Sequence, residues 1–188
     1  MKNLEKTSSS ENLDLFYYRL LHLNQPKDSM HILQEQVERM REYMHINHIE
    51  TTGMCKAMSN LVYNNLNDMG ISCSLLNTYD LFNCYEHEFV VANLMVESGI
   101  EYILIDITYS QFLPKEKEKL SEYFKFFPTE LLKGNHMLND LLEKGYSLID
   151  EEDFQLYLYS IHQNKEQMHQ ICLQDILYKT YSQHNKKS

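Results

Sequence analysis

The sequence predicts an α+β domain in which helices precede and follow a small antiparallel sheet. Apolar residues recur at helical spacing before residue 70 and after residue 114. The stretch between them is rich in Val, Ile, Leu and Tyr, which favour strands. A chain of 188 residues that is 43% hydrophobic suffices for one sizeable core. We therefore expect a single domain over residues 1–188, because separate runs of helices and strands are typical of α+β folds.

The first two predicted helices lie between residues that can cap or stop them. Ser10 can cap a helix that Pro26 ends, and Ser29 can cap a second helix through about Met44. Residues 45–52 are the predicted connecting loop. The two helices form an expected N-terminal flank over about residues 10–45.

A third helix is predicted from a cap at Thr51 or Thr52 to a stop at Gly70, with Cys55 in its first turn. Glycine suits the left-handed conformation that ends many helices. The apolar stripe of this helix comprises Met54, Met58, Leu61, Val62, Leu66 and Met69.

Three extended segments follow, over residues 71–78, 87–97 and 101–108. Ser98-Gly99 predicts a hairpin turn between the last two, which should therefore be antiparallel neighbours. We expect the core of the domain over about residues 51–113.

The last third of the chain returns to helical patterns. Pro114 suits a first helical position, Pro128 ends that helix, and Asp150 can cap a later one. Gly145 and Asn164 act as separators. The predicted helices cover residues 114–127, 129–144, 151–162 and 165–181, which form a C-terminal flank over about residues 114–182.

Charge and hydropathy exclude several classes of partner. The formal net charge is -10, and Asp plus Glu outnumber Lys plus Arg by 27 to 17. Nucleic-acid binding needs clustered Lys and Arg, so we expect no nucleic-acid partner. No apolar run approaches the ~20 residues of a membrane span, and the first residues lack the apolar core of a secretory signal. We expect a chain made as a soluble cytoplasmic protein; delivery into a host cell by a secretion system that needs no signal peptide stays open.

The four cysteines are spaced too irregularly for a disulfide scaffold, so reduced thiols are expected. Cys84 and His87, with Cys73 nearby, have the spacing of half a zinc site. Structural zinc usually needs a second close pair of ligands, and the sequence shows none. We expect no metal and no cofactor.

Cys55, His87 and Asp106 follow one another at positions that suit a thiol enzyme. A cysteine at a helix start meets the positive end of the helix dipole, which favours the thiolate and an oxyanion beside it. Gly53 leaves room for a substrate backbone. His87 opens a strand and can act as a base, and Asp106 can orient it. Taken singly, each residue has an ordinary alternative, such as a buried thiol or a core histidine.

Asp106 follows the apolar run 102–105, where an unpaired buried carboxylate would cost free energy. An imidazole on the neighbouring strand would supply the partner. Counted from the Ser98-Gly99 turn, His87 and Asp106 are not opposite each other. We therefore expect a bulge or a wider loop within residues 94–99.

Three ordered motifs lie between Gly53 and Phe112. G-M-C opens a helix that ends in Gly-Ile before a strand, H-E-F-V begins the next strand, and Y-I-L-I-D-I-T ends a third. Together they resemble the core of the transglutaminase-like superfamily. The resemblance covers about a third of the chain and implies a papain-like fold with Cys55 as nucleophile, His87 as base and Asp106 as the residue that orients it.

Two departures from the family pattern bear on the branch. Ile107 stands where the family usually has proline, and the chain has no tryptophan, which many animal transglutaminases place beside the oxyanion. The short chain and the run D-I-T-Y-S-Q-F look closer to small bacterial members. These are toxin and effector glutamine deamidases, related effector proteases and peptide-maturation proteases.

The resemblance implies acyl transfer from a carboxamide through a thioester. It favours deamidation of a protein glutamine or hydrolysis of a peptide bond; transglutaminase and biosynthetic amide-forming activities share the first half-reaction. The alternative from another class is an inactive binding module on the same fold. We expect substrate choice in the loop 78–86 and the helical flanks, and name Asn47 and His48 as candidates for a second oxyanion donor.

Overall fold

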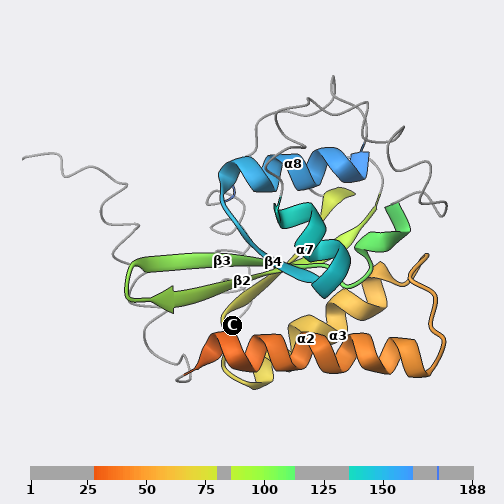
Figure 1. Cartoon of the computed structure of the whole chain (residues 1–188), viewed down its shortest axis with the longest axis horizontal. Helices are drawn as coiled ribbons and strands as arrows, with labels where there is room; N and C mark the ends of the chain where they lie inside the picture. The colour runs from red at the N-terminus through yellow and green to blue at the C-terminus, as the bar shows by residue number, and fades with distance from the viewer. Residues whose placement is uncertain (1–27, 80–85, 113–135, 163–172, 174–188) are drawn as a thin grey trace, which may run out of the picture.

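The computed structural model describes residues 28–79, 86–112, 136–162 and 173 of the 188-residue chain (Figure 1). Helices and strands both contribute to the fold, which confirms the predicted α+β class. In chain order the elements are α2 (Ser29–Ile46), α3 (Cys55–Asp68), β1 (Cys73–Asn77), β2 (Glu88–Val96), β3 (Gly99–Ile105), the short 3-10 helix η1 (Tyr109–Phe112), α7 (His136–Lys144), β4 (Tyr146–Ile149) and α8 (Glu151–His162).

The four strands form one antiparallel sheet in the order β1-β2-β3-β4, so consecutive strands are neighbours. In the β2–β3 hairpin Val96 pairs with Gly99, so Glu97 and Ser98 make the turn. The predicted turn at Ser98-Gly99 is therefore displaced by one residue. This displacement sets which residues of β2 and β3 lie opposite each other.

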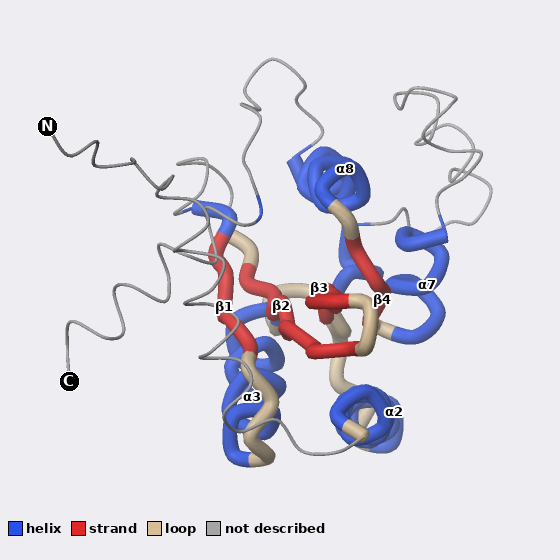
Figure 2. Tube along the Cα trace, turned by 90° about the vertical axis from the view of Figure 1, so that its left-hand side faces the viewer, coloured by secondary structure: helices blue, strands red, loops and turns tan. Residues whose placement is uncertain are grey.

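Helices cover both faces of this sheet: α2 and α3 lie on one side, α7 and α8 on the other (Figure 2). Successive side chains of a strand point to opposite faces, so β2 sends Val90 toward α2 and α3 and sends Phe89 and Val91 toward α7 and α8. Burial on both faces explains why β2 is almost continuously apolar. Each fully buried Val, Leu, Ile or Phe side chain contributes about 1.5–3 kcal/mol of hydrophobic stabilisation.

The predicted starts of two helices are wrong. Asp28, in a left-handed conformation, precedes α2, so Ser29 is the first helical residue and not the cap. Helix α3 begins at Cys55 after Met54, whose N–H donates to the Thr51 carbonyl. This backbone turn leads directly into α3. Neither α2 nor α3 has a capping hydrogen bond from a side chain at its start.

Two predicted helix boundaries are confirmed, the end of α3 and the start of α8. Gly70 has φ 76° after α3, and its N–H donates to the Asn67 carbonyl, as expected for a left-handed stop. Asp150 caps α8, because its side-chain oxygen accepts a hydrogen bond from the N–H of Asp153 at 2.8 Å. Helix α8 has the predicted bounds, Glu151–His162.

The prediction missed strand β4. The segment after Gly145 was expected to separate two helices, and only its pairing with β3, Tyr102 opposite Ile149, makes it a strand. Four residues are too few to show a strand pattern. The helices predicted over 10–25 and 114–127 lie outside the described residues. So do residues 129–135 of the helix whose described part is α7, and all of the helix predicted over 165–181 except residue 173. Among the helices that are described, none has the length and apolarity needed to cross a membrane.

Candidate functional site

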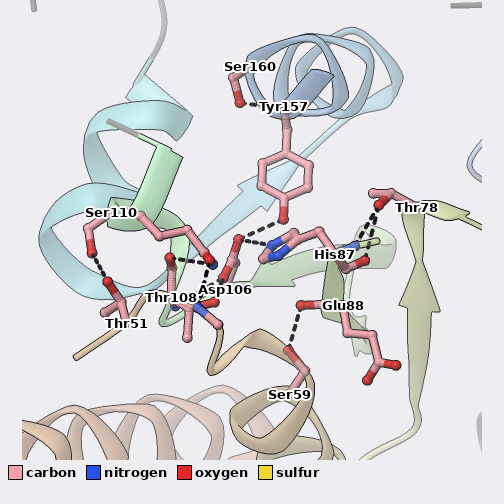
Figure 3. Close-up of polar contacts among 12 residues, drawn as sticks. Thr51, Ser59, Thr78, His87, Glu88, Asp106, Thr108, Ser110, Tyr157 and Ser160 are labelled. Carbon is pink, nitrogen blue, oxygen red and sulfur yellow. Dashed lines mark hydrogen bonds and ion pairs between the residues drawn. The ribbon is translucent and has the colours of Figure 1, made fainter. Parts of the chain in front are cut away.

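The structure brings His87 and Asp106 into direct contact. His87 comes immediately before β2 and Asp106 immediately after β3. The imidazole Nε2 lies 2.8 Å from Asp106 Oδ2, and both side chains are fully buried (Figure 3). Nε2 therefore donates to the carboxylate, which leaves Nδ1 as the nitrogen that can exchange a proton with a thiol.

A regular ladder produces this contact, and the predicted bulge or wider loop is wrong. The β2–β3 register runs without interruption from Val96 opposite Gly99 to Val90 opposite Ile105. One further step places Phe89 opposite Asp106, and His87 lies two residues before Phe89 on the same face. Diagonal neighbours on one face of an antiparallel pair are within reach of long side chains.

Four hydrogen bonds hold the Asp106 carboxylate. Oδ1 accepts from the N–H of Thr108 at 3.0 Å and from its hydroxyl at 2.9 Å. Oδ2 accepts from His87 and from the Tyr157 hydroxyl, at 2.8 Å each. Such a set of donors offsets the cost of burying a carboxylate and fixes its orientation.

The sequence prediction missed both Tyr157 and Thr108. The spacing of Asp106 and Thr108 is that of an Asx-type turn, in which an aspartate accepts from a backbone N–H two residues later, and this signal was readable. Tyr157 comes from α8, 51 residues after Asp106, and nothing local marks it. Burial, followed by the charge of Asp106, raises the pKa of Tyr157 well above 10.0, so its hydroxyl keeps the proton that it donates.

Cys55, the first residue of α3, lies against this pair and is partly exposed. Its interaction with His87 is the largest influence on the pKa of the thiol, which is lowered from 9.0 although burial opposes the change. The contact is looser than a formed hydrogen bond, because the buried Nδ1 of His87 has no hydrogen-bond partner among the described residues. Loose contacts of this kind are common in catalytic sites that hold no substrate.

The same contacts change the pKa of His87. Burial disfavours the charged imidazole, but the charge and hydrogen bond of Asp106, together with Cys55, outweigh it and raise the pKa from 6.5 to about 9. The lowered pKa of Cys55 and the raised pKa of His87 both favour a thiolate beside an imidazolium at neutral pH.

Aromatic rings enclose the imidazole. The Phe112 ring meets it edge-on with 4.6 Å between centroids, and Phe89 stacks against it at 6.3 Å. This apolar wall keeps water from competing for the hydrogen bond between His87 and Asp106.

The loop before Cys55 is tied to η1, which follows Asp106. Gly53 adopts φ 74°, and its N–H donates to Gln111 Oε1 at 3.4 Å. The Ser110 hydroxyl donates to Thr51 Oγ1 at 3.3 Å (Figure 3). Among the described residues, a Cβ atom at Gly53 would meet nothing within 4 Å, so there is open space beside the backbone two residues before Cys55.

Neither suggested oxyanion donor is placed at the site. The side-chain amide of Asn47 donates to the Tyr43 carbonyl at 2.8 Å and closes the end of α2, and His48 takes a left-handed conformation with φ 52°. Within the described part of the chain, no hydrogen bond links either residue to Cys55. The N–H of Cys55 itself starts α3 and has no helical acceptor.

The second described cysteine differs sharply from Cys55. Burial raises the pKa of Cys73 to about 12, and its Sγ lies 3.7 Å from the Tyr63 carbonyl. Cys84 and Cys172 lie outside the described residues. Within residues 28–79, 86–112 and 136–162, no group of three or more His, Cys, Asp or Glu side chains is placed to hold a metal ion.

Comparisons with known proteins identify no relative of this chain. No protein-family model matches this chain, and searches of curated proteins and of solved structures likewise return no match. The function is therefore inferred from the geometry of Cys55, His87 and Asp106.

Proposed function

We propose that this protein is a cysteine-dependent hydrolase that acts on carboxamides through a thioester, deamidating a protein glutamine or cleaving a peptide bond. One observation carries the proposal: a partly exposed thiol at a helix start contacts a buried imidazole that a four-times hydrogen-bonded carboxylate orients. The choice of hydrolysis rests on the resemblance to small bacterial members of the transglutaminase-like superfamily.

The first half-reaction uses the polarity of the Cys55–His87 pair. The thiolate attacks the amide carbon, and the N–H of Cys55 can donate to the oxyanion that forms. His87 Nδ1 then gives its proton to the departing ammonia or amine, and the thioester remains on Cys55. Asp106 keeps Nε2 protonated and the ring aligned throughout.

Water completes the reaction. His87 Nδ1 takes a proton from a water molecule, whose oxygen attacks the thioester carbon. The carboxylic acid leaves, and the thiolate and imidazolium form again. An amine acceptor in place of water would give a transglutaminase or an amide-forming enzyme, with the same residues in the same roles.

The arrangement of elements also supports a papain-like or transglutaminase-like core. The proposed nucleophile opens a helix packed against an antiparallel sheet, and the proposed base and carboxylate lie directly beside the ends of two adjacent strands of that sheet. Their chain order, Cys55 before His87 before Asp106, is the order in the family that the motifs resemble.

Glutamine-containing peptides of varied sequence, with and without an added primary amine, provide the test. Mass spectrometry distinguishes a glutamine converted to glutamate, a cleaved backbone and an amine adduct, and a coupled assay measures released ammonia. We expect one of the first two products from the wild type and from Cys73→Ala, and none from Cys55→Ala. Turnover by Cys55→Ala would contradict the proposal, and an amine adduct as the main product would replace the hydrolase with a transglutaminase.

A further inference from the structure

Glu88 contacts the nucleophile helix through both its backbone and its side chain. It is the first residue of β2 and directly follows His87, so the two side chains point to opposite faces of the sheet. His87 faces Asp106 and Tyr157, whereas Glu88 turns toward α3 (Figure 3). The carboxylate of Glu88 is buried, with 8% of its side chain exposed.

The backbone of Glu88 meets one row of α3 residues. Cys55 and Ser59 are four positions apart and therefore share a helix face. The N–H of Glu88 interacts with the Cys55 sulfur and helps to lower its pKa. The Ser59 hydroxyl donates to the Glu88 carbonyl at 2.7 Å (Figure 3).

The side chain of Glu88 meets the adjacent row. Asn60 donates to Oε2 at 2.9 Å, and the Lys56 Nζ lies 3.8 Å from Oε1. Asn77 of β1 adds a hydrogen bond to Oε1 at 3.2 Å. All three partners are donors, so the site is built for a carboxylate.

We propose that Glu88 is a positioning residue that fixes Cys55 at the height of His87 by holding the first two turns of α3 against β2. The inference rests on the proposed function, since it concerns the pair that this function uses. Glu88 thereby also affects the charge state of the thiol, because the interaction with His87 that lowers the Cys55 pKa persists only while Glu88 keeps the helix in place.

Glu88→Gln separates positioning from a direct charge effect, because the two have opposite signs. Glutamine replaces one oxygen by an amino group, which then faces a donor of Asn60 or Asn77. Asn60 cannot turn its amide without losing its bond to the Lys56 carbonyl at 2.7 Å. A loosened helix raises the Cys55 pKa, whereas loss of a nearby negative charge alone would lower it.

The experiment measures the rate of iodoacetamide labelling of each cysteine against pH, with the modified residue mapped by mass spectrometry. For the wild type we expect Cys55 to label with a midpoint well below the ~8.5 of an ordinary thiol. For Glu88→Gln we expect that midpoint to rise, with labelling at acidic pH about tenfold slower for each unit of the rise. Ser59→Ala, which removes one bond and no charge, should give a smaller change in the same direction.

Glu86→Gln is the matched control. Glu86 also contacts Lys56 at 3.6 Å and Asn77 at 3.3 Å, but 58% of its side chain is exposed. Its replacement should leave the Cys55 midpoint unchanged. Cys73 reports the fold, because it stays unreactive while it is buried.

The outcomes are distinguishable. An unchanged or lowered midpoint in Glu88→Gln, with Cys73 still protected, would overturn the positioning role and leave the proposed function standing. If Cys73 becomes reactive in Glu88→Gln, the fold has loosened and Ser59→Ala decides: a raised midpoint supports the proposal and an unchanged one overturns it. A wild-type midpoint near 8.5 would instead overturn the proposed function itself.

Discussion

The two faces of the sheet differ in how deeply they bury the residues of the site. On the face covered by α7 and α8, His87, Asp106 and Tyr157 are buried, and hydrogen bonds join them into one network. On the face covered by α2 and α3, Cys55 is partly exposed at the start of a helix. The molecule therefore separates a buried His87–Asp106 pair from a partly exposed thiol. Strand β2 links the two, because His87 and Glu88 are consecutive residues that point to opposite faces.

Asp106→Asn gives the largest expected effect within the buried network. An asparagine can present its amino group to His87 Nε2, which would favour the wrong tautomer of the ring. In serine hydrolases the equivalent change costs about 10⁴-fold in kcat, and we expect a loss of about 10³–10⁴-fold here. Comparison of kcat with KM for a cleaved peptide checks this, since a fully buried Asp106 should affect kcat more than KM. An unchanged kcat would show that the buried pair is structural only.

Gly145→Ala tests how closely the chain packs beside Asp106. Gly145 has φ 79°, its carbonyl accepts from the N–H of Asp106 at 2.9 Å, and an added Cβ would lie 2.9 Å from Ile107 Cγ2. Left-handed strain of about 1–2 kcal/mol and the steric conflict of about 1–3 kcal/mol should together lower the free energy of unfolding measured in urea.

Gly53→Ala is the matched control at an open position. Gly53 also has a positive φ, 74°, but an added Cβ meets nothing within 4 Å. Strain alone should cost about 1–2 kcal/mol. Equal losses of stability for the two variants would contradict the close packing at Gly145.

Tyr157→Phe should have a smaller effect. It removes one of four hydrogen bonds to Asp106 and leaves the ring in place. We expect a loss of about 1 kcal/mol in the free energy of unfolding and about a tenfold loss in kcat, because one donor is missing and the carboxylate is less firmly held. Tyr159→Phe, on the same helix but partly exposed, serves as the control and should change neither quantity.

The sequence predicted the parts of the fold whose signals are local. Helical periodicity and the stop at Gly70 located α3, and Asp150 marked the start of α8, because capping and amphipathicity act within a few residues. Strand β4 was missed because four residues gain their conformation from pairing with β3 and not from their own pattern.

The site was predictable as a set of residues but not as a geometry. Moving the hairpin turn by one residue shifts every cross-strand partner by two positions. With this shift His87 and Asp106 are ordinary diagonal neighbours, and no bulge is needed. Tyr157 and the contacts of Glu88 come from elements far apart in the sequence, so only the assembled fold reveals them.

The central claim is that Cys55 and His87 form a thiolate and an imidazolium at neutral pH. Because the Cys55 pKa is lowered and the His87 pKa is raised to about 9, the ion pair forms as the thiol loses its proton and is lost as pH rises through about 9. Activity should follow the same window. The stability that the charged His87 contributes is complete below pH 6.5 and is lost as pH rises through about 9.

The most direct measurement titrates both groups in the folded protein. Thiolate absorbance, taken as the difference between the wild type and Cys55→Ala, reports the sulfur, and nuclear magnetic resonance of the imidazole reports His87. We predict a thiolate well below pH 8.5 and an imidazole that stays protonated to about pH 9. A thiolate that appears only near pH 8.5, beside an imidazole that titrates near 6.5, would contradict the account.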